Sequence, residues 1–277
     1  MREAVIVAGA RTPIGKAKKG SLATVRPDDF GAAVVKETLK RAGYEGPIDD
    51  LILGCAMPEA EQGMNVARSI GALAGLPDTT PALTINRFCS SGLQAIAYAA
   101  ERIMLGHSKA ILAGGVESMS MVPMVGNTPR LNPTLAETAP QYYMGMGHTA
   151  EEVARQYNVS REDQDAFAVR SHVLAEKAIQ EGKFNDEIVP IEVEQHYVDA
   201  NNKLQVKKFT FSMDEGVRPG TSVEGLAKLR PAFHVKGSVT AGNASQTSDG
   251  AAAVLVMDRE EAEKQGMTPM AKFLGFA

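Results

Sequence analysis

The stretch Asn86-Arg87-Phe88-Cys89-Ser90-Ser91-Gly92-Leu93-Gln94-Ala95-Ile96 carries the strongest local signal in this chain of 277 residues. A short apolar run, Leu83–Asn86, predicts a strand before the cysteine, and Ser90–Leu105 predicts a helix after it. The first N–H groups of a helix stabilise an anion, which favours a thiolate and an oxyanion on an attached thioester. This stretch alone leaves two interpretations of Cys89 open, a nucleophile and a buried structural cysteine.

Outward from this stretch, short apolar runs alternate with amphipathic ones. Strands and helices are predicted in chain order at Ala4–Val7, Phe30–Arg41, Leu51–Leu53, Val66–Ala74 and Ala110–Ala113, and again at Ala251–Met257, Arg259–Gln265 and Ala271–Leu274. Glycines are expected to end several of these elements, as Gly114-Gly115 do after Ala113. Strands that alternate with helices at this spacing predict an α/β domain with a parallel or mixed sheet.

The alternation breaks between residues 118 and about 240, where loops rich in Met and Pro surround two helices. Thr149 with Glu152 fits a capping box, and Ser160 is the expected N-cap of a helix over Arg161–Gln180. An extended stretch, Glu187–Val193, precedes a polar linker at residues 199–202. We therefore expect residues 1–117 and 247–277 to form the α/β domain, and residues 118–246 to form an inserted, α-rich loop domain.

Composition excludes several classes of protein. Hydrophobic residues make up 44% and charged residues 22% of the chain, as in ordinary globular domains, and acids and bases are interspersed at a net charge of −4. No basic patch indicates a nucleic-acid partner. Two cysteines, Cys55 and Cys89, make a disulfide framework improbable and favour a reducing compartment. The first apolar run is too short for a signal peptide or membrane span, so we expect a cytoplasmic protein.

The stretch around Cys89 resembles the nucleophile motif of thiolases, and it does not stand alone. Further segments resemble other thiolase signatures in family order: Val7–Lys16, Gly114–Ser120, Met146–Glu151, Ser160–Asp165, Val239–Ser245 and Asp249–Ala253. The resemblance implies a thiolase-like α/β fold, with a mixed five-stranded sheet, helices on both faces and the inserted loop domain. It also implies that the chain ends in the first strand of a C-terminal half that is absent.

The resemblance implies roles for particular residues. Cys89 is the expected nucleophile, which takes the acyl group as a thioester, and the loop domain is expected to hold coenzyme A. Arg218 falls at a position beside the adenine and phosphate end of CoA. The pantetheine arm is expected to meet Met146, Phe233, Ala241 and Ser245. No metal or redox cofactor is implied, because CoA is a substrate, and the complete enzyme is expected to be a homodimer or homotetramer that acts on acyl-CoA and CoA, with no membrane partner.

Two departures from the family bear on the substrate. A histidine that some acetoacetyl-specific members carry before Met146 is Gly145 here, and a serine near the pantetheine is replaced by Gly225. Both leave more room, which favours a 3-ketoacyl-CoA thiolase of fatty-acid β-oxidation over its alternative, a biosynthetic acetyl-CoA acetyltransferase. None of the five histidines lies in the Gly-His-Pro context of the family's catalytic base, and Cys55 precedes Cys89 and matches no catalytic role. A non-catalytic acyl-CoA or lipid-binding relative is the alternative from another class.

Overall fold

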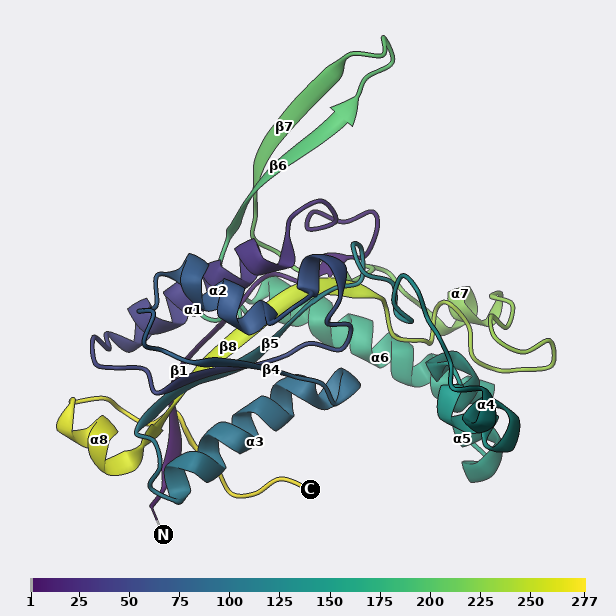
Figure 1. The fold of residues 1–277 in the computed structure, drawn as a ribbon. Coiled ribbons are helices and arrows are strands. Elements are labelled where there is room, and N and C mark those ends of the chain that lie inside the picture. Colours follow the sequence, from purple (N-terminus) through teal and green to yellow (C-terminus); the bar gives the residue numbers. More distant parts are fainter. Residues whose placement is uncertain (1) are drawn as a thin grey trace. The chain divides into compact units, whose positions relative to one another are not determined.

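A computed structural model describes residues 2–277 (Figure 1), and these form two compact units. The first contains the chain up to Asn127, Asp186–Glu215 and Thr247–Ala277. The second contains Thr128–Asn185 and Gly216–Gln246. Within the described residues, no helix combines the length and the apolar character needed to cross a membrane.

A mixed sheet forms the centre of the first unit. Its strands run in the order β4 (Ala82–Ile85), β3 (Asp50–Gly54), β5 (Ala110–Ser118), β8 (Ser248–Asp258), β1 (Ala4–Arg11) and β9 (Ala271–Lys272), and β2 (Gly15–Lys16) pairs with β8. Strand β3 is parallel to β4 and β5, whereas β8 is antiparallel to both β5 and β1. The expected mixed sheet of five strands is confirmed, with two further strands of two residues each.

Helices cover both faces of this sheet, as expected (Figure 1). Helices α1 (Pro27–Ala42) and α2 (Val66–Ala74) contribute to one apolar core, and α3 (Ser91–Met104) contributes to the other. Strand β5 serves both, because successive side chains of a strand point to opposite faces, so Leu112 lies in the first core and Ile111 in the second. The unit also has a 3₁₀ turn at Ala60–Gln62 and a short helix α8 (Arg259–Lys264).

Two predicted strand ends were wrong. Strand β1 continues past Gly9 to Arg11 through an irregularity in register between Ile6 and Ala8. Strand β5 runs through Gly114-Gly115 to Ser118. A Cβ on Gly114 would lie 2.0 Å from the carbonyl oxygen of Ala252 on the neighbouring strand. Gly114 is therefore required by the close approach of β8, and it does not end the strand.

A hairpin of β6 (Ile191–Val198) and β7 (Leu204–Phe211) extends from the first unit (Figure 1). Its base joins the main core, because Ile191, Val193 and Phe211 are buried there. Its far end is solvent-exposed, and the polar linker expected at residues 199–202 forms its turn. The hairpin thus belongs with the sheet, a division that differs from the single inserted domain expected over residues 118–246.

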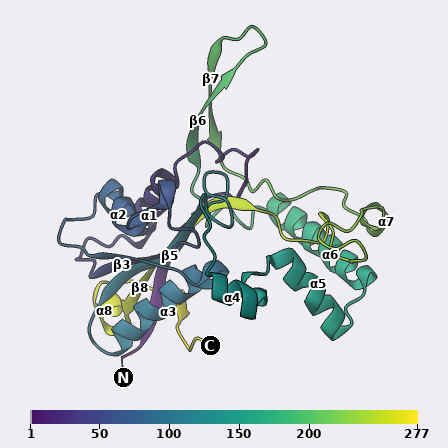
Figure 2. The ribbon, with the colours of Figure 1, turned by 45° about the vertical axis from the view of Figure 1, so that its right-hand side comes forward.

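The second unit is rich in helix, as expected (Figure 2). It holds α4 (Pro133–Thr138), a 3₁₀ turn at Pro140–Tyr143, α5 (Met146–Tyr157), α6 (Arg161–Gln180) and α7 (Val223–Ala227). Ser160 is the N-cap of α6, and its Oγ accepts the N–H of Asp163 at 3.0 Å. The capping box at Thr149 was wrong, because α5 begins three residues earlier and the Thr149 hydroxyl instead donates to the carbonyl of Gly145.

Candidate active site

Cys89 lies in a 3₁₀ turn, Phe88–Ser90, that joins β4 to the start of α3. Its side chain is exposed, whereas a structural role in the core would require burial. Helix α3 packs on the sheet through fully buried alanines, among them Ala95 and Ala99. The cysteine thus lies between a strand and the N-terminal end of a helix, as predicted, and its thiol is presented to solvent.

The turn itself is strained. Phe88 has a φ of +46°, in the left-handed region that residues other than glycine rarely adopt. Hydrogen bonds hold it there: its N–H donates to Asn86 Oδ1 at 2.8 Å, and its carbonyl accepts the Ser91 hydroxyl at 2.6 Å. The Ser91 Oγ also accepts the N–H of Arg87 at 2.8 Å. Such strain persists only where the surroundings over-determine it, and it is common at functional sites.

A glycine sets how closely this turn approaches the sheet. A Cβ on Gly54, the last residue of β3, would lie 2.4 Å from the carbonyl carbon of Ser91. The first residues of α3 therefore rest on the backbone of β3 without an intervening side chain. This contact fixes the distance between the end of β3 and the Cys89 turn, Phe88–Ser90.

Cys55, the other cysteine, lies in a contrasting environment. It is 1% exposed and its Sγ lies 4.0 Å from Glu117 Oε1. Burial, followed by the nearby Glu117 carboxylate, raises the pKa of Cys55 to about 12. The Glu117 carboxylate also accepts the N–H of Ala56 at 2.6 Å and the Gln62 amide at 2.7 Å. Cys55 therefore remains a neutral thiol at physiological pH, which agrees with its lack of a match to any catalytic role of the family.

The residues expected to contact CoA lie in the second unit, and all five are at least partly exposed. Met146 is the first residue of α5, and the ring of Phe233 lies against Gly147, where a Cβ would be 2.1 Å from Phe233 Cδ1. The N–H of Ala232 donates to Val239 O at 2.9 Å, which brings the segment of Phe233 beside that of Ala241. The structure thus brings Met146, Phe233 and the segment of Ala241 together.

Arg218 and Ser245 are held by contacts of their own. The N–H of Arg218 donates to His172 Nδ1 at 3.2 Å, and the Ser245 hydroxyl donates to the carbonyl of Gln246 at 3.3 Å. The guanidinium of Arg218 lies on the surface. Among the described residues, no hydrogen bond or ion pair joins Arg218 or Ser245 to Met146, Phe233 or Ala241.

Three polar side chains that hold the loop before Ser245 were not assigned roles from the sequence. The Glu151 carboxylate accepts the N–H groups of Ser238 and Val239, each at 2.9 Å. The Asn243 amide donates to Asp165 at 2.9 Å. All three lie in segments that resemble family motifs, which was the available signal. Their hydrogen bonds span up to 88 residues of sequence and could not be inferred from spacing.

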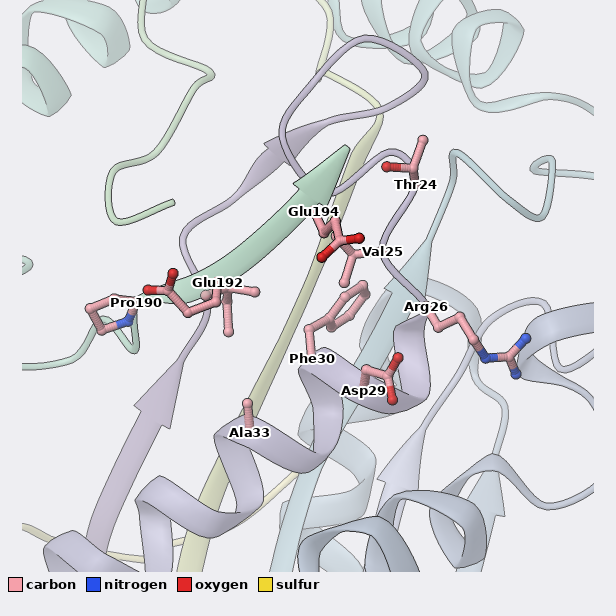
Figure 3. A pocket seen from close by; sticks show the side chains of 10 residues that line it. Thr24, Val25, Arg26, Asp29, Phe30, Ala33, Pro190, Glu192 and Glu194 are labelled. Atoms are coloured by element: carbon pink, nitrogen blue, oxygen red, sulfur yellow. The ribbon is translucent and has the colours of Figure 1, made fainter. Parts of the chain in front are cut away.

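The first unit also has an open cavity of about 510 Å³ between the start of α1 and β6 (Figure 3). It is lined by Thr24, Val25, Arg26, Asp29, Phe30, Ala33, Pro190, Ile191, Glu192 and Glu194. Three carboxylates and one guanidinium among these side chains suit a phosphate-rich ligand poorly. None of the residues expected to contact CoA lines this cavity.

Comparisons with known proteins agree with the motifs. A family model described as thiolase, N-terminal domain, matches residues 4–260. A 3-ketoacyl-CoA thiolase of Bacillus subtilis (strain 168) is 69% identical over 278 aligned positions, which cover 100% of this chain and 71% of the relative. A 3-ketoacyl-CoA thiolase of Marinomonas sp. (strain MWYL1) is 46% identical, with 99% of this chain and 69% of the relative covered.

A solved structure shows the same fold. The crystal structure of the Bacillus anthracis acetyl-CoA acetyltransferase matches with a TM-score of 0.84 at 40% identity, over 98% of this chain and 69% of that one. The expected thiolase-like fold is thereby confirmed. On the match of the family model and these identities, the chain belongs to the thiolase family of acyltransferases.

Proposed function

We propose that the protein is a 3-ketoacyl-CoA thiolase that carries the acyl group on Cys89. The observation that supports this most is the exposed Cys89 on a strained turn at the N-terminal end of α3. The 3-ketoacyl-CoA thiolases of Bacillus subtilis and Marinomonas sp. support the substrate class.

In the thiolytic direction, the Cys89 thiolate attacks the 3-keto carbon and the bond between C2 and C3 breaks. Acetyl-CoA leaves as its enolate and is protonated at C2. The thiolate of free CoA then attacks the thioester carbonyl, and the shortened acyl-CoA leaves as Cys89 is regenerated. Backbone N–H groups at the start of α3 are suited to stabilise the negative charge on the thioester oxygen. The reaction is an acyl transfer between thiols, so its chemistry requires no metal or redox cofactor.

We propose that the second unit binds CoA. The Arg218 guanidinium would meet the phosphates, and Met146, Phe233, Ala241 and Ser245 would line the pantetheine arm. Apolar walls with few polar partners suit such an arm, and a cation suits phosphate. Homo-oligomeric assembly and a cytoplasmic location stay predictions.

We assign the degradative direction on the space beside two glycines. Around a Cβ on Gly145, the nearest atom within 4 Å is His148 Nδ1 at 3.9 Å, and around one on Gly225 it is Ser222 Oγ at 3.5 Å. Both positions thus lack a side chain where room for one exists, which favours longer acyl chains. The biosynthetic alternative gains support from the Bacillus anthracis acetyl-CoA acetyltransferase. Relative rates on acetoacetyl-CoA and on longer 3-ketoacyl-CoA distinguish the two.

The test of the nucleophile is to incubate the protein with an acyl-CoA and locate the acyl thioester by peptide mass spectrometry. We expect the adduct on Cys89 and none on Cys55, and we expect Cys89→Ala to lose it. CoA binding without any adduct would favour the non-catalytic alternative, and an adduct elsewhere would overturn the assignment of Cys89.

A further inference from the structure

Asn86 connects the Cys89 turn to a second segment of the fold. While its Oδ1 accepts the N–H of Phe88, its Nδ2 donates to the carbonyl of Ala56 at 2.9 Å. Ala56 follows β3 and lies 30 residues away in sequence. One side chain thus ties the strained residue before Cys89 to the loop that follows the neighbouring strand.

The Ala56 loop is itself anchored by a carboxylate. The Ala56 N–H donates to Glu117 Oε2 at 2.6 Å, and the Gln62 amide donates both to Glu117 Oε1 at 2.7 Å and to the carbonyl of Met57 at 2.8 Å. Gln62 is fully buried, and its Oε1 accepts the N–H of Ser118. Because an ionised acceptor forms roughly twice as strong a hydrogen bond as a neutral one, Glu117 is the strongest fixed point of this group.

We propose that Glu117 is a positioning residue for the nucleophile, acting through the Ala56 loop and Asn86 on the turn that carries Cys89. Glu117 accepts the Ala56 N–H, the Ala56 carbonyl accepts the Asn86 amide, and Asn86 Oδ1 accepts the N–H of Phe88, whose φ is positive. The Ser91 hydroxyl also stabilises this turn, through its hydrogen bonds with Arg87 and Phe88. The inference rests on the proposed function, since it assigns a purpose to the geometry of a nucleophilic Cys89.

The test measures the second-order rate of Cys89 alkylation by iodoacetamide from pH 6 to pH 10, with stability measured separately by urea unfolding. We expect Asn86→Ala to lower the rate at pH 7.5 about three- to tenfold, the range that one hydrogen bond supports. The pH–rate profile should change as well, because the position of the thiol relative to the start of α3 changes. A purely structural role would lower stability and leave this pH profile unchanged, which would overturn the proposal.

Glu117→Gln keeps the shape of the side chain but has one acceptor where the carboxylate offers two, so it cannot accept from both Ala56 and Gln62. We expect the same direction of change as in Asn86→Ala, by about threefold. The matched control is Glu215→Gln, since Glu215 also accepts backbone N–H groups in the first unit, from Lys16 at 2.9 Å and Ser21 at 3.0 Å. The control should leave the Cys89 profile unchanged.

Two further variants test whether Asn86 and Glu117 act on the turn through the same hydrogen bonds. Asn86→Ser retains an acceptor for the Phe88 N–H but cannot reach Ala56, so its rate should fall although the local turn persists. The double variant of Asn86→Ala and Glu117→Gln should be no slower than Asn86→Ala alone, because the two residues act along one line. A wild-type rate for Asn86→Ser, or additive losses in the double variant, would refute the proposal.

The alkylation experiment and the acyl-adduct experiment can fail independently of each other. An acyl adduct on Cys89 together with unchanged alkylation in these variants would refute the positioning role alone. Altered alkylation without any acyl adduct would refute the thiolase function and leave the positioning of the thiol standing.

Discussion

The contact between Gly54 and Ser91 predicts an asymmetric response to a single added methyl group. In Gly54→Ala, the new Cβ would lie 2.4 Å from the Ser91 carbonyl carbon and 2.6 Å from the Gly92 nitrogen. Both are backbone atoms, so no side chain can rotate away, and either β3 or the start of α3 must move by about 1 Å to restore an ordinary contact. Overpacking of this kind destabilises a protein by about 1–3 kcal/mol.

Gly92→Ala is the matched control, because it adds a methyl group to the facing segment. There the nearest atom would be the carbonyl oxygen of Gly114 at 3.6 Å, an ordinary contact. Replacing a helical glycine by alanine stabilises a helix by up to about 1 kcal/mol, so we expect Gly92→Ala to be neutral or stabilising.

Urea unfolding monitored by circular dichroism measures both changes. Acyl transfer should also fall in Gly54→Ala, by up to about a hundredfold if the Cys89 turn moves by about 1 Å. Two results would refute this reasoning: wild-type stability and activity in Gly54→Ala, or equal damage in Gly92→Ala and Gly54→Ala. Either would show that the position of the turn does not depend on the absence of a Cβ at Gly54.

Three further predictions concern charge, strain and ligand binding. Because the pKa of Cys55 is raised in the folded protein, this thiol contributes stability that is complete below about pH 9 and is lost as the pH rises toward 12, by up to about 1.4 kcal/mol per pH unit. In urea unfolding between about pH 9 and 10.5, Cys55→Ala should therefore lose less stability with rising pH than the wild-type protein. An equal loss in both proteins would contradict this prediction. Because alanine at position 88 keeps the strain of a positive φ and glycine does not, Phe88→Gly should be more stable than Phe88→Ala by about 1 kcal/mol in the same assay, and the reverse order would argue against a strained turn. Arg218→Ala should weaken CoA binding by roughly 1–2 kcal/mol in calorimetry while Arg26→Ala does not, and unchanged affinity at low salt would remove Arg218 from the site.

Elements defined by local interactions could be predicted from the sequence. The helix over Val66–Ala74 was predicted with the observed bounds, because its amphipathic pattern and Gly75, at a φ of +83°, lie within a few residues. The same holds for the Ser160 cap of α6. Elements set by distant contacts could not be predicted. Gly114 was expected to end a strand, because its contact with the distant strand β8 cannot be seen in the sequence. The side chains of the β6–β7 hairpin that are buried could not be predicted either, because they are buried by contacts with the main core.

The candidate site divides in the same way. The strand, turn and helix that carry Cys89 could be predicted from the sequence, because they follow one another directly along the chain. The role of Cys89 as the nucleophile stays a prediction. The link from Glu117 to Ala56 could not be predicted, because it joins residues 61 positions apart and uses a backbone N–H that has no signature in the sequence. The exposed state of Cys89 could not be predicted either, because it depends on how α3 packs against the sheet.

The central place of β8 has a consequence for how the chain is made. Strand β8 pairs with β1 on one side and with β5 on the other. In the sequence, however, 129 residues lie between the last residue of β5, Ser118, and the first residue of β8, Ser248. At about 5–20 residues per second, a ribosome takes roughly 6 to 26 s to add that stretch. During this interval β1 and β5 lack the strand that joins them, and their inward-facing apolar side chains are open to other nascent chains. Synthesis should therefore depend on chaperones at this stage, and slowing translation between residues 118 and 248 should lower the yield of folded protein.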